Sequence, residues 1–266
     1  MTTGDSEEQS EPHVVILADN ATAQDLPNAP DIIVDVQDTG FASDRANSHV
    51  AIETGAVTFL DILGWKGIWR RDDDPISKLN RLIERIRREL DEGARGTDLD
   101  VDPQSEVISI SDTIGLFTRA SEQQASSALE LHGRVCSNVI PVSIEEGIPV
   151  RGATSFGEYR LFDTRFVGQA IDEAAAWYEQ ADWIGVHMTP SADFCKSDAK
   201  RDALTAWTRY QPPRITWRTL CVHWDASLPL LRQVFRQSGP IGPEIVGKFT
   251  NTIAFIEKDK QTNETT

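Results

Sequence analysis

Two short segments that each run into an aspartate constrain the fold of this chain most. The first, Ala56 to Trp65, is rich in apolar residues and contains Asp61 three residues before Gly64. The second, Val107 to Asp112, brings another aspartate 51 residues after the first. Runs of this length and composition, followed by turn residues, predict β-strands. Two aspartates at neighbouring strand ends would form a divalent metal site, although an aspartate there is also a common turn former or helix cap.

Composition limits the classes of function that remain. The 266 residues are 39% apolar, which is enough for one large domain with extensions. A formal charge of −16 argues against a nucleic-acid surface, because phosphate binding needs clustered Lys and Arg. Any nucleotide must therefore sit in a local pocket, where metal ions offset its charge. Cys136, Cys195 and Cys221 have no metal-ligand or disulfide spacing and indicate core residues in a reducing cytoplasm.

Both ends of the chain are polar and lack periodicity. Residues 1–12 and 258–266 therefore predict disordered tails. No apolar run approaches the ~20 residues that cross a bilayer, and the start does not resemble a signal sequence, so we expect a cytoplasmic protein without a membrane partner. Residues 13–53 form an N-terminal extension with two short apolar runs, which predict accessory strands at 14–18 and 32–36.

The main domain is expected at residues 54–190, with residues 191–257 as the C-terminal part of the same domain. Its pattern predicts, in order, a strand, a helix, a hairpin, a helix, a second hairpin, a helix and a strand. The expected bounds are 56–63, 76–90, 106–118 with its bend at Ser111-Asp112, 121–142, 148–162 with a turn at Phe156-Gly157, 168–180 and 183–188. Within residues 196–258 we expect at least a short helix, a strand at 216–224 and helices near 228–237 and 243–256. This order favours a ferredoxin-like α+β fold with an antiparallel sheet flanked by helices.

The turn behind the first aspartate could contact phosphate. Residues 62–66 are short, contain Gly64 and lead towards a helix, so their backbone N–H groups could face a triphosphate. Lys66 could add a charged contact. Trp65 could pack against a base or a partner, or simply belong to the core. Arg151 could contact phosphate, or pair with an acidic neighbour in so acidic a chain.

Four of these segments resemble the motifs of one family. Phe59 to Trp65 resembles the first metal motif of class III nucleotide cyclases: an aromatic, any residue, Asp-Ile, any residue, Gly and an aromatic. Asp112 with the apolar strand after it resembles the second. Val150 to Glu158 is similar to the stretch after the dimerisation helix in bacterial antiphage pyrimidine cyclases of the Pycsar type. Gly168 to Ala174 resembles the helix opening that follows, so the resemblance spans about residues 54–190 in the family's order.

The resemblance implies an enzyme, a ferredoxin-like cyclase domain and a metal cofactor. Asp61 and Asp112 would be the catalytic aspartates, and with the backbone of Ile62 they would bind two Mg²⁺ or Mn²⁺ ions. Gly64, Trp65, Lys66, Arg151 and Arg165 would contact the nucleoside triphosphate. In this family the site forms between two protomers, so a homodimer is implied. The product would be a cyclic nucleotide that signals in antiphage defence through a separate effector protein.

The base is suggested by two departures from adenylyl cyclases of this family. Ile108 stands where they carry an adenine-reading lysine, and Arg165 stands where they carry the partner acidic residue. Uracil offers O2 and O4 as acceptors, which the donors of an arginine can satisfy. UTP, giving 3′,5′-cyclic UMP, is therefore favoured. CTP, giving cyclic CMP, stays open because cytosine also offers O2.

Two further departures affect catalysis. The family's helix carries an Asn and, four residues on, an Arg that steadies the transition state; by alignment on Gly168 these positions are Asp172 and Ala176. The cation must then come from Arg151, Arg160 or a C-terminal lysine, or be absent. The last case would make the chain a catalytically silent cyclase-like domain that binds a nucleotide or a partner.

Overall fold

A computed structural model of the chain describes residues 50–96, 105–195, 204–237 and 243–263. The expected strands at 14–18 and 32–36 and the expected tail at 1–12 lie outside these residues. The described part is a mixed α+β fold in which helices flank one eight-stranded sheet.

The sheet has its long strands at one side and short strands at the other. Its order is β2-β3-β1-β4-β6-β8-β7, and β5 pairs with the far end of β4. Every paired neighbour is antiparallel except β4 and β6, which run parallel. The sheet is therefore mixed, not antiparallel throughout as the sequence predicts. The strands are β1 (Glu53–Ile62), β2 (Ser105–Ile110), β3 (Thr113–Arg119), β4 (Val150–Phe162), β5 (Arg165–Val167), β6 (Gly185–Met188), β7 (Trp207–Tyr210) and β8 (Thr219–Val222).

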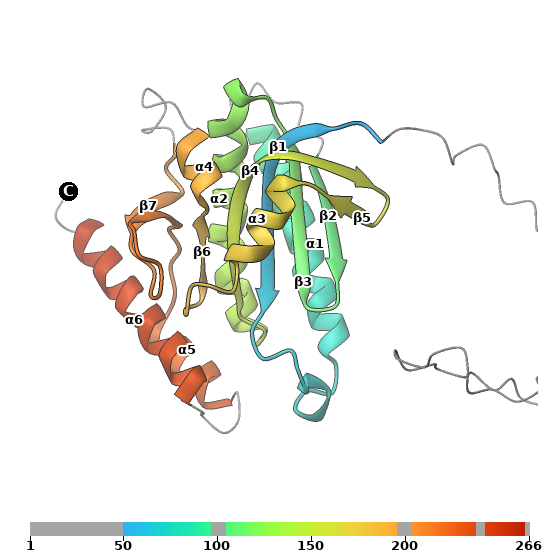
Figure 1. The fold of residues 1–266 in the computed structure, drawn as a ribbon. Coiled ribbons are helices and arrows are strands. Elements are labelled where there is room, and N and C mark those ends of the chain that lie inside the picture. The colour runs from blue at the N-terminus through green and yellow to red at the C-terminus, as the bar shows by residue number, and fades with distance from the viewer. Residues whose placement is uncertain (1–49, 97–104, 196–203, 238–242, 264–266) are drawn as a thin grey trace, which may run out of the picture. The chain divides into compact units, whose positions relative to one another are not determined.

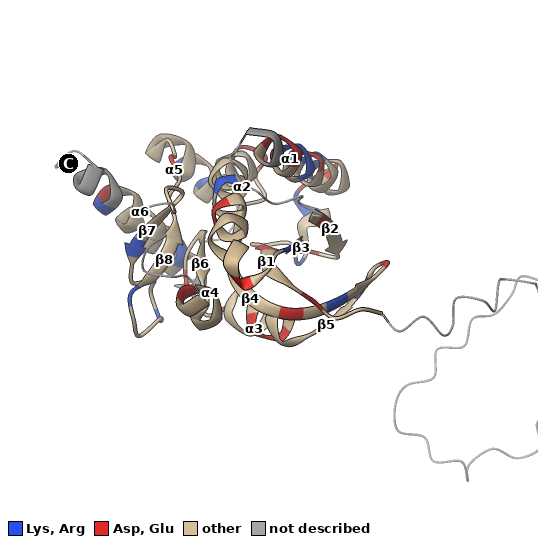
Figure 2. Ribbon diagram, turned by 90° about the horizontal axis from the view of Figure 1, so that it is seen from above, with Lys and Arg blue, Asp and Glu red and all other residues tan. Residues whose placement is uncertain are grey.

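Helices cover both faces of the sheet. Helices α1 (Pro75–Gly96) and α2 (Ala125–Glu145) lie on one face, and α3 (Gln169–Trp177) lies across β1 and β4 on the other (Figure 1, Figure 2). Beside the short strands lie α5 (Leu228–Gln237) and α6 (Pro243–Asn263). The remaining helices are α4 (Pro190–Cys195), η2 (Ile68–Arg70) and η3 (Glu122–Gln124). Within the described ranges, no helix combines the length and apolarity that a bilayer crossing requires.

Strand β1 divides its side chains between the two faces, because successive residues of a strand point to opposite sides. Ala56, Leu60 and Ile62 are buried in the core beneath α1 and α2. Val57 and Phe59 are buried in the smaller core beneath α3. The same alternation directs Asp61 to the α3 face, at the end of a strand whose other residues are held by packing on both sides.

The predicted turn at Phe156-Gly157 is wrong. Strand β4 runs unbroken through this position, where Phe156 pairs with Ala56 and Gly157 with Gly55 of β1. The turn comes later, at Asp163, whose φ of 57° is the left-handed conformation that Asp tolerates. A glycine inside a strand often marks close approach of another backbone instead of a turn. The two glycines face each other, and a Cβ on Gly55 would lie 2.1 Å from the carbonyl oxygen of Thr118.

Two C-terminal features also differ from the expectation. Strand β7 (Trp207–Tyr210) pairs with β8 in a segment for which the sequence predicts no strand. Helix α6 continues to Asn263, past residue 258, where the sequence predicts the start of a disordered tail. The helices expected at 76–90, 121–142, 168–180 and 228–237, and the hairpin that bends at Ser111-Asp112, are present with the same or shifted bounds. The further short helix expected after residue 196 is absent from the described residues 204–227, and α4 ends before this segment, at Cys195.

Candidate metal and nucleotide site

The two aspartates come together at one edge of the sheet. Asp61 lies near the end of β1, and Asp112 lies in the tight turn between β2 and β3. Because β1 pairs with β3, Asp61 stands opposite Thr113, and the backbone N–H of Ile62 donates to the carbonyl of Asp112 at 3.0 Å. Asp61 and Asp112 line the same cavity, which has a volume of about 600 Å³.

Most of the other site residues expected from the sequence line this cavity too. They are Ile62, Gly64, Trp65, Lys66 and Arg151. Arg165 does not line it; this residue is exposed on β5, where that short strand pairs with the end of β4. The cavity of one chain therefore holds the proposed metal and phosphate residues but not the proposed base-reading arginine.

The turn after β1 is held in shape by backbone contacts. Gly64 has a φ of 78°, which favours glycine, and its carbonyl accepts a hydrogen bond from the Arg71 guanidinium. The N–H of Leu63 donates to the carbonyl of Pro149 at 2.8 Å. The carbonyl of Ile62 accepts a long hydrogen bond of 3.4 Å from the N–H of Trp65. These contacts fix the turn at the mouth of the cavity.

Arg151 is the immediate partner of Asp61. The two residues are opposite each other in the β1–β4 register, and Arg151 Nε donates to Asp61 Oδ2 at 2.9 Å. The guanidinium also lies 3.4 Å from Glu179 Oε1 and 6.0 Å from the centre of the Tyr178 ring. The sequence left open whether Arg151 contacts phosphate or pairs with an acid, and here it pairs while still lining the cavity.

The charge of Asp61 is affected by opposing influences. Burial raises the pKa of Asp61 above its ordinary value, the hydrogen bond and charge of Arg151 lower it, and the nearby charges of Asp112 and Glu179 raise it. The side chain of Asp61 is 11% exposed. Since the two aspartates repel each other across the cavity, a cation between them would stabilise both carboxylates.

The residues present fit a hard divalent cation. The donors are two carboxylates and the backbone carbonyl of Ile62, which are all oxygen ligands of the kind that Mg²⁺ and Mn²⁺ prefer. In the part of the chain that the structure describes, no group of three or more His, Cys, Asp or Glu side chains is arranged for a metal. Mg²⁺ is commonly bound by one or two carboxylates with substrate phosphates and water as its other ligands. The aspartate pair meets this pattern only when a phosphate compound is bound as well.

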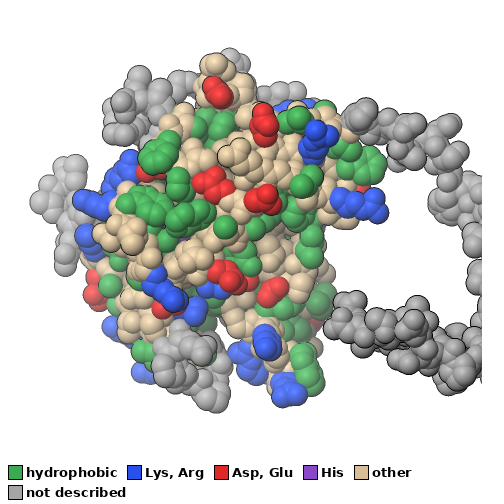
Figure 3. Space-filling view, viewed as in Figure 1, with side chains coloured by type: hydrophobic (Ala, Val, Ile, Leu, Met, Phe, Trp, Pro, Cys, Tyr) green, Lys and Arg blue, Asp and Glu red, His purple; other side chains and the backbone are tan. Residues whose placement is uncertain are grey.

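Basic side chains are concentrated around the cavity although the chain as a whole is acidic. Five cations line it with four carboxylates, whereas the whole sequence has 26 Lys and Arg against 42 Asp and Glu. The space-filling view of one face shows acidic side chains scattered among apolar and other residues, with basic ones mostly towards its rim (Figure 3). The five cations are Lys66, Arg71, Lys78, Arg151 and Lys248. Such a lining suits a polyanion that brings its own metal ions.

Three of these cations could not be found from the sequence. Arg71 and Lys78 follow the first motif, and Lys78 forms an ion pair with Asp72. Lys248 comes from α6, far along the chain. None of them belongs to a local motif, and only the fold brings them to the aspartates. Of the three origins considered for a transition-state cation, Arg151 and a C-terminal lysine line the cavity, whereas Arg160 lies elsewhere and donates to the carbonyl of Val50 at 3.2 Å.

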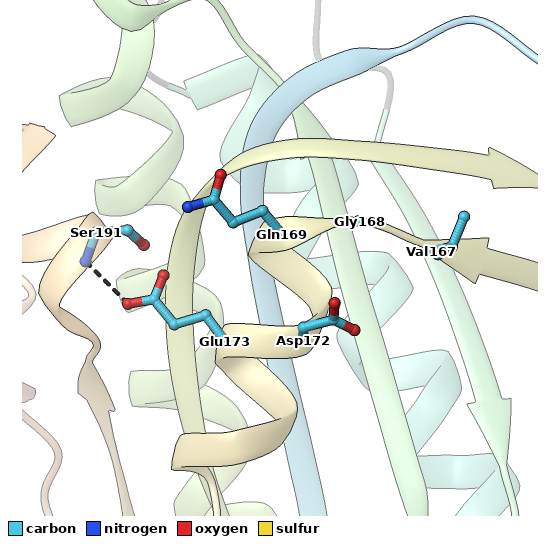
Figure 4. A pocket seen from close by; sticks show the side chains of 6 residues that line it. All are labelled: Val167, Gly168, Gln169, Asp172, Glu173 and Ser191. Atoms are coloured by element: carbon cyan, nitrogen blue, oxygen red, sulfur yellow. Dashed lines mark hydrogen bonds between the residues drawn. The ribbon is translucent and has the colours of Figure 1, made fainter.

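The two positions that depart from the family's catalytic pattern lie outside the cavity. Asp172 and Ala176 are exposed, one turn apart on α3. Asp172 lines a second, shallow pocket at the start of α3, where Glu173 accepts a hydrogen bond of 3.0 Å from the backbone N–H of Ser191 (Figure 4). This pocket presents two carboxylates and no cation, so it does not suit a phosphate.

Comparisons with known proteins give a limited likeness. No protein-family model matches the chain, and no curated protein matches it. Among solved structures, the catalytic core of a rhodopsin-guanylyl cyclase with converted specificity, in complex with ATPαS, is 16% identical, with a TM-score of 0.44 over 66% of this chain and 98% of that chain. An adenylate/guanylate cyclase/hydrolase from Silicibacter pomeroyi is 12% identical, with a TM-score of 0.41 over 66% and 99%. Adenylate cyclases from Trypanosoma brucei give 13% identity and a TM-score of 0.42 over 68% and 92%. Because these scores and identities are low, the function proposed next depends on the residues of this chain.

Proposed function

We propose that this protein is a nucleotide cyclase, which converts a nucleoside triphosphate to a 3′,5′-cyclic nucleotide and pyrophosphate. UTP is the favoured substrate and cyclic UMP the favoured product, with cyclic CMP as the alternative. The observation that supports this most is the meeting of Asp61 and Asp112 in one cavity lined by five cations. The proposed role, by resemblance, is a second messenger in bacterial antiphage defence that acts on a separate effector.

The reaction needs positioning and charge neutralisation more than covalent help from the protein. The 3′-hydroxyl attacks the α-phosphorus of the same nucleotide, its proton is lost, and pyrophosphate leaves. Asp61, Asp112 and the Ile62 carbonyl would hold Mg²⁺ or Mn²⁺, which when bound offsets phosphate charge and acidifies the hydroxyl. Lys66 and Arg151 line the same cavity as the aspartates and would orient the polyphosphate from the turn and from β4.

Base recognition is proposed to involve a second copy of the chain. Arg165 is exposed and stands outside the cavity of its own chain, so a partner could bring it to the base. Its donors match O2 and O4 of uracil, and cytosine stays the alternative because it also offers O2 as an acceptor. A homodimer with sites at its interface, as the resemblance implies, accounts for an arginine that its own cavity does not use.

The second candidate is a catalytically silent cyclase-like domain that binds a nucleotide and regulates a partner. The observation in its favour is that α3 presents Asp172 and Ala176, exposed, where the family has an Asn and an Arg. The observation against it is the aspartate pair, because a buried carboxylate such as Asp61 costs free energy and a silent domain has no need to keep it.

One experiment separates these functions. The purified protein is incubated with each of the four nucleoside triphosphates and Mn²⁺, and products are identified by mass. A cyclase releases a cyclic nucleotide and pyrophosphate from one of them, with UTP expected. A silent domain retains the triphosphate unchanged, which would overturn the proposal.

The aspartates are tested by Asp61→Asn and Asp112→Asn. Each variant should lower product formation by about 100-fold or more, because a metal-binding carboxylate is lost. Asp163→Asn is the matched control, since Asp163 occupies another hairpin turn outside the cavity. Thermal melts of all three should show that the fold persists. Full activity in either cavity variant contradicts the proposed role of the pair.

A further inference from the structure

The last two helices form one wall of the cavity that contains the aspartates. Val234 and Gln237 come from α5, and Ile245, Lys248 and Phe249 come from α6. The two helices lie beside the short strands and reach the end of the sheet at which β1 finishes (Figure 1). The sequence assigned no role in the site to this region, apart from naming an unspecified C-terminal lysine as one source of a cation.

Helix α6 is fixed to the sheet by specific contacts. Asn251 Nδ2 donates to the carbonyl of Asp182 at 2.8 Å, and Thr252 Oγ1 accepts a hydrogen bond of 2.8 Å from the N–H of Ile184. Gly247 allows the close approach, because a Cβ there would lie 2.9 Å from Asp182 Oδ2. These contacts join α6 to the segment that leads into β6. Because these contacts fix α6, they also fix the position of Lys248, which follows Gly247 in the sequence.

Lys248 is held near the cavity by a long ion pair. Its Nζ lies 3.4 Å from Asp182 Oδ1, and its side chain is 22% exposed. A triphosphate carries more negative charge than one carboxylate, and phosphate oxygens are strong acceptors for an ammonium group. Lys248 can therefore leave Asp182 for a phosphate, or contact both, in the cavity that the sheet-borne Arg151 also lines.

The same wall offers an apolar surface. Val234 and Phe249 are each only 5% exposed, and Ile245 is partly buried beside them. The ring of Phe249 is fixed against Phe235, with ring centres 3.9 Å apart. Small-molecule sites commonly have volumes of ~300–1,000 Å³ and combine apolar walls with a few placed charges, and this cavity falls within that range.

We infer that α5 and α6 form a further wall of the nucleotide site within each chain, with Lys248 as a contact for the triphosphate and Ile245, Val234 and Phe249 as the surface against the nucleoside. This inference rests on the proposed function, and it adds a binding surface outside the four motifs. It also means that one chain binds the nucleotide by itself, while base selection and turnover need the second copy.

Binding without turnover is the direct test. The ligand is 3′-deoxy-UTP, which lacks the attacking hydroxyl, with Mn²⁺ present, and affinity is measured by titration calorimetry. Lys248→Met should weaken binding about tenfold or more, as expected for the loss of a hydrogen bond between charged groups. Lys258→Met is the matched control, because Lys258 is exposed on the same helix outside the cavity and should leave the affinity unchanged. With uridine monophosphate the effect of Lys248→Met should be smaller.

A purely structural role for Lys248 predicts a different result. If this lysine only holds Asp182, then Asp182→Asn removes the same ion pair and should weaken binding as much as Lys248→Met. If Lys248 contacts phosphate, then Asp182→Asn keeps or raises the affinity and Lys248→Arg restores most of it. For the apolar wall, Ile245→Asn should weaken binding, whereas Val246→Asn, at an exposed neighbouring residue outside the cavity, should not.

The outcomes separate this inference from the function on which it rests. A wild-type protein that binds no nucleoside triphosphate overturns both. A wild-type protein that binds 3′-deoxy-UTP, with Lys248→Met and Ile245→Asn equally tight, overturns this inference alone and leaves the cyclase proposal standing.

Discussion

A fall in pH from 7 to 5 should destabilise this protein through two buried histidines. The clearer case is His132 of α2, which has no exposed surface and lies between two strands. His132 Nδ1 is 2.7 Å from Thr58 Oγ1 of β1, and its Nε2 is 2.9 Å from Thr118 Oγ1 of β3. The Thr58 hydroxyl lies in turn 2.7 Å from Thr154 Oγ1, and the Thr118 hydroxyl lies 2.8 Å from Ser105 Oγ. This chain of groups joins α2 to four strands, and no carboxylate belongs to it to stabilise a charged imidazole.

The size of this loss of stability follows from the difference between the histidine pKa values in the folded and the unfolded chain. Burial lowers the pKa of His132 from 6.5 to about 3 and that of His187 from 6.5 to about 4. Because the folded pKa is depressed, the unfolded chain takes up the proton first. The stability is therefore fully present above pH 6.5 and is lost progressively as the pH falls towards the folded values. At pH 5 each histidine lowers the free energy of unfolding by about 2 kcal/mol. The two together lower it by about 4 kcal/mol, whereas the whole free energy of unfolding of a protein is typically ~5–15 kcal/mol.

The assay is urea denaturation at pH 7, 6 and 5, compared with the variants His132→Gln and His187→Gln. Glutamine keeps a donor and an acceptor but does not titrate in this range. The wild-type free energy of unfolding should fall by about 4 kcal/mol between pH 7 and pH 5, and that of either variant by about 2 kcal/mol. Contributions from groups common to all three proteins cancel in the comparison. An equal loss in wild type and His132→Gln would refute the reasoning, since it would mean that the folded protein accommodates a charged His132.

Two further predictions concern stability and use matched pairs. Gly152→Ala should destabilise the fold by about 1–3 kcal/mol in urea denaturation, because its Cβ would lie 2.3 Å from the carbonyl oxygen of Phe59, whereas Gly157→Ala in the same strand meets only an ordinary contact of 3.7 Å and should be tolerated. Similar costs for both would argue against the close packing of β1 and β4. Glu130→Ala should cost about 2–4 kcal/mol, because this buried carboxylate accepts hydrogen bonds from three neighbouring groups. Glu145→Ala, exposed on the same helix, should change the melting curve little, and an equal effect of the two would contradict this reasoning.

The parts of the fold that follow from the sequence are those with a strong local signal. Helix α1 shows apolar residues at helical spacing, and the β2–β3 hairpin bends at a serine and an aspartate, with Ser111 at a φ of 57°. The failures concern contacts between distant segments. A glycine at position 157 predicts a turn when read alone, but it lies inside β4, paired with Gly55 of another strand. The parallel pairing of β4 with β6 likewise depends on which strands meet, and a local pattern carries no such information.

The residues of the candidate site also fall into those that a local motif identifies and those that only the fold brings together. Asp61, Asp112 and the Gly64 turn belong to short segments that a motif can single out, and the structure brings all three to one cavity. Lys78 and Lys248 are ordinary lysines on helices, and nothing beside them in the sequence distinguishes them from solvated ones. Their relevance comes from the three-dimensional arrangement, in which α1 and α6 line a cavity with the ends of β1 and the β2–β3 turn.

The ion pair between Arg151 and Asp61 explains how so buried an aspartate can serve a metal site. Burial and the charge of Asp112 both raise the pKa of Asp61, and a carboxylate that took up a proton would lose its affinity for a cation. Arg151 acts against both influences, because its hydrogen bond and its charge lower the pKa. It therefore favours the ionised form before any metal or nucleotide arrives. A divalent ion held by Asp61 would compete with this ion pair, and the guanidinium, which lines the same cavity, would then be available to a phosphate. One arginine could thus keep Asp61 ionised and also contact the substrate, which connects a structural ion pair to the proposed catalytic cation.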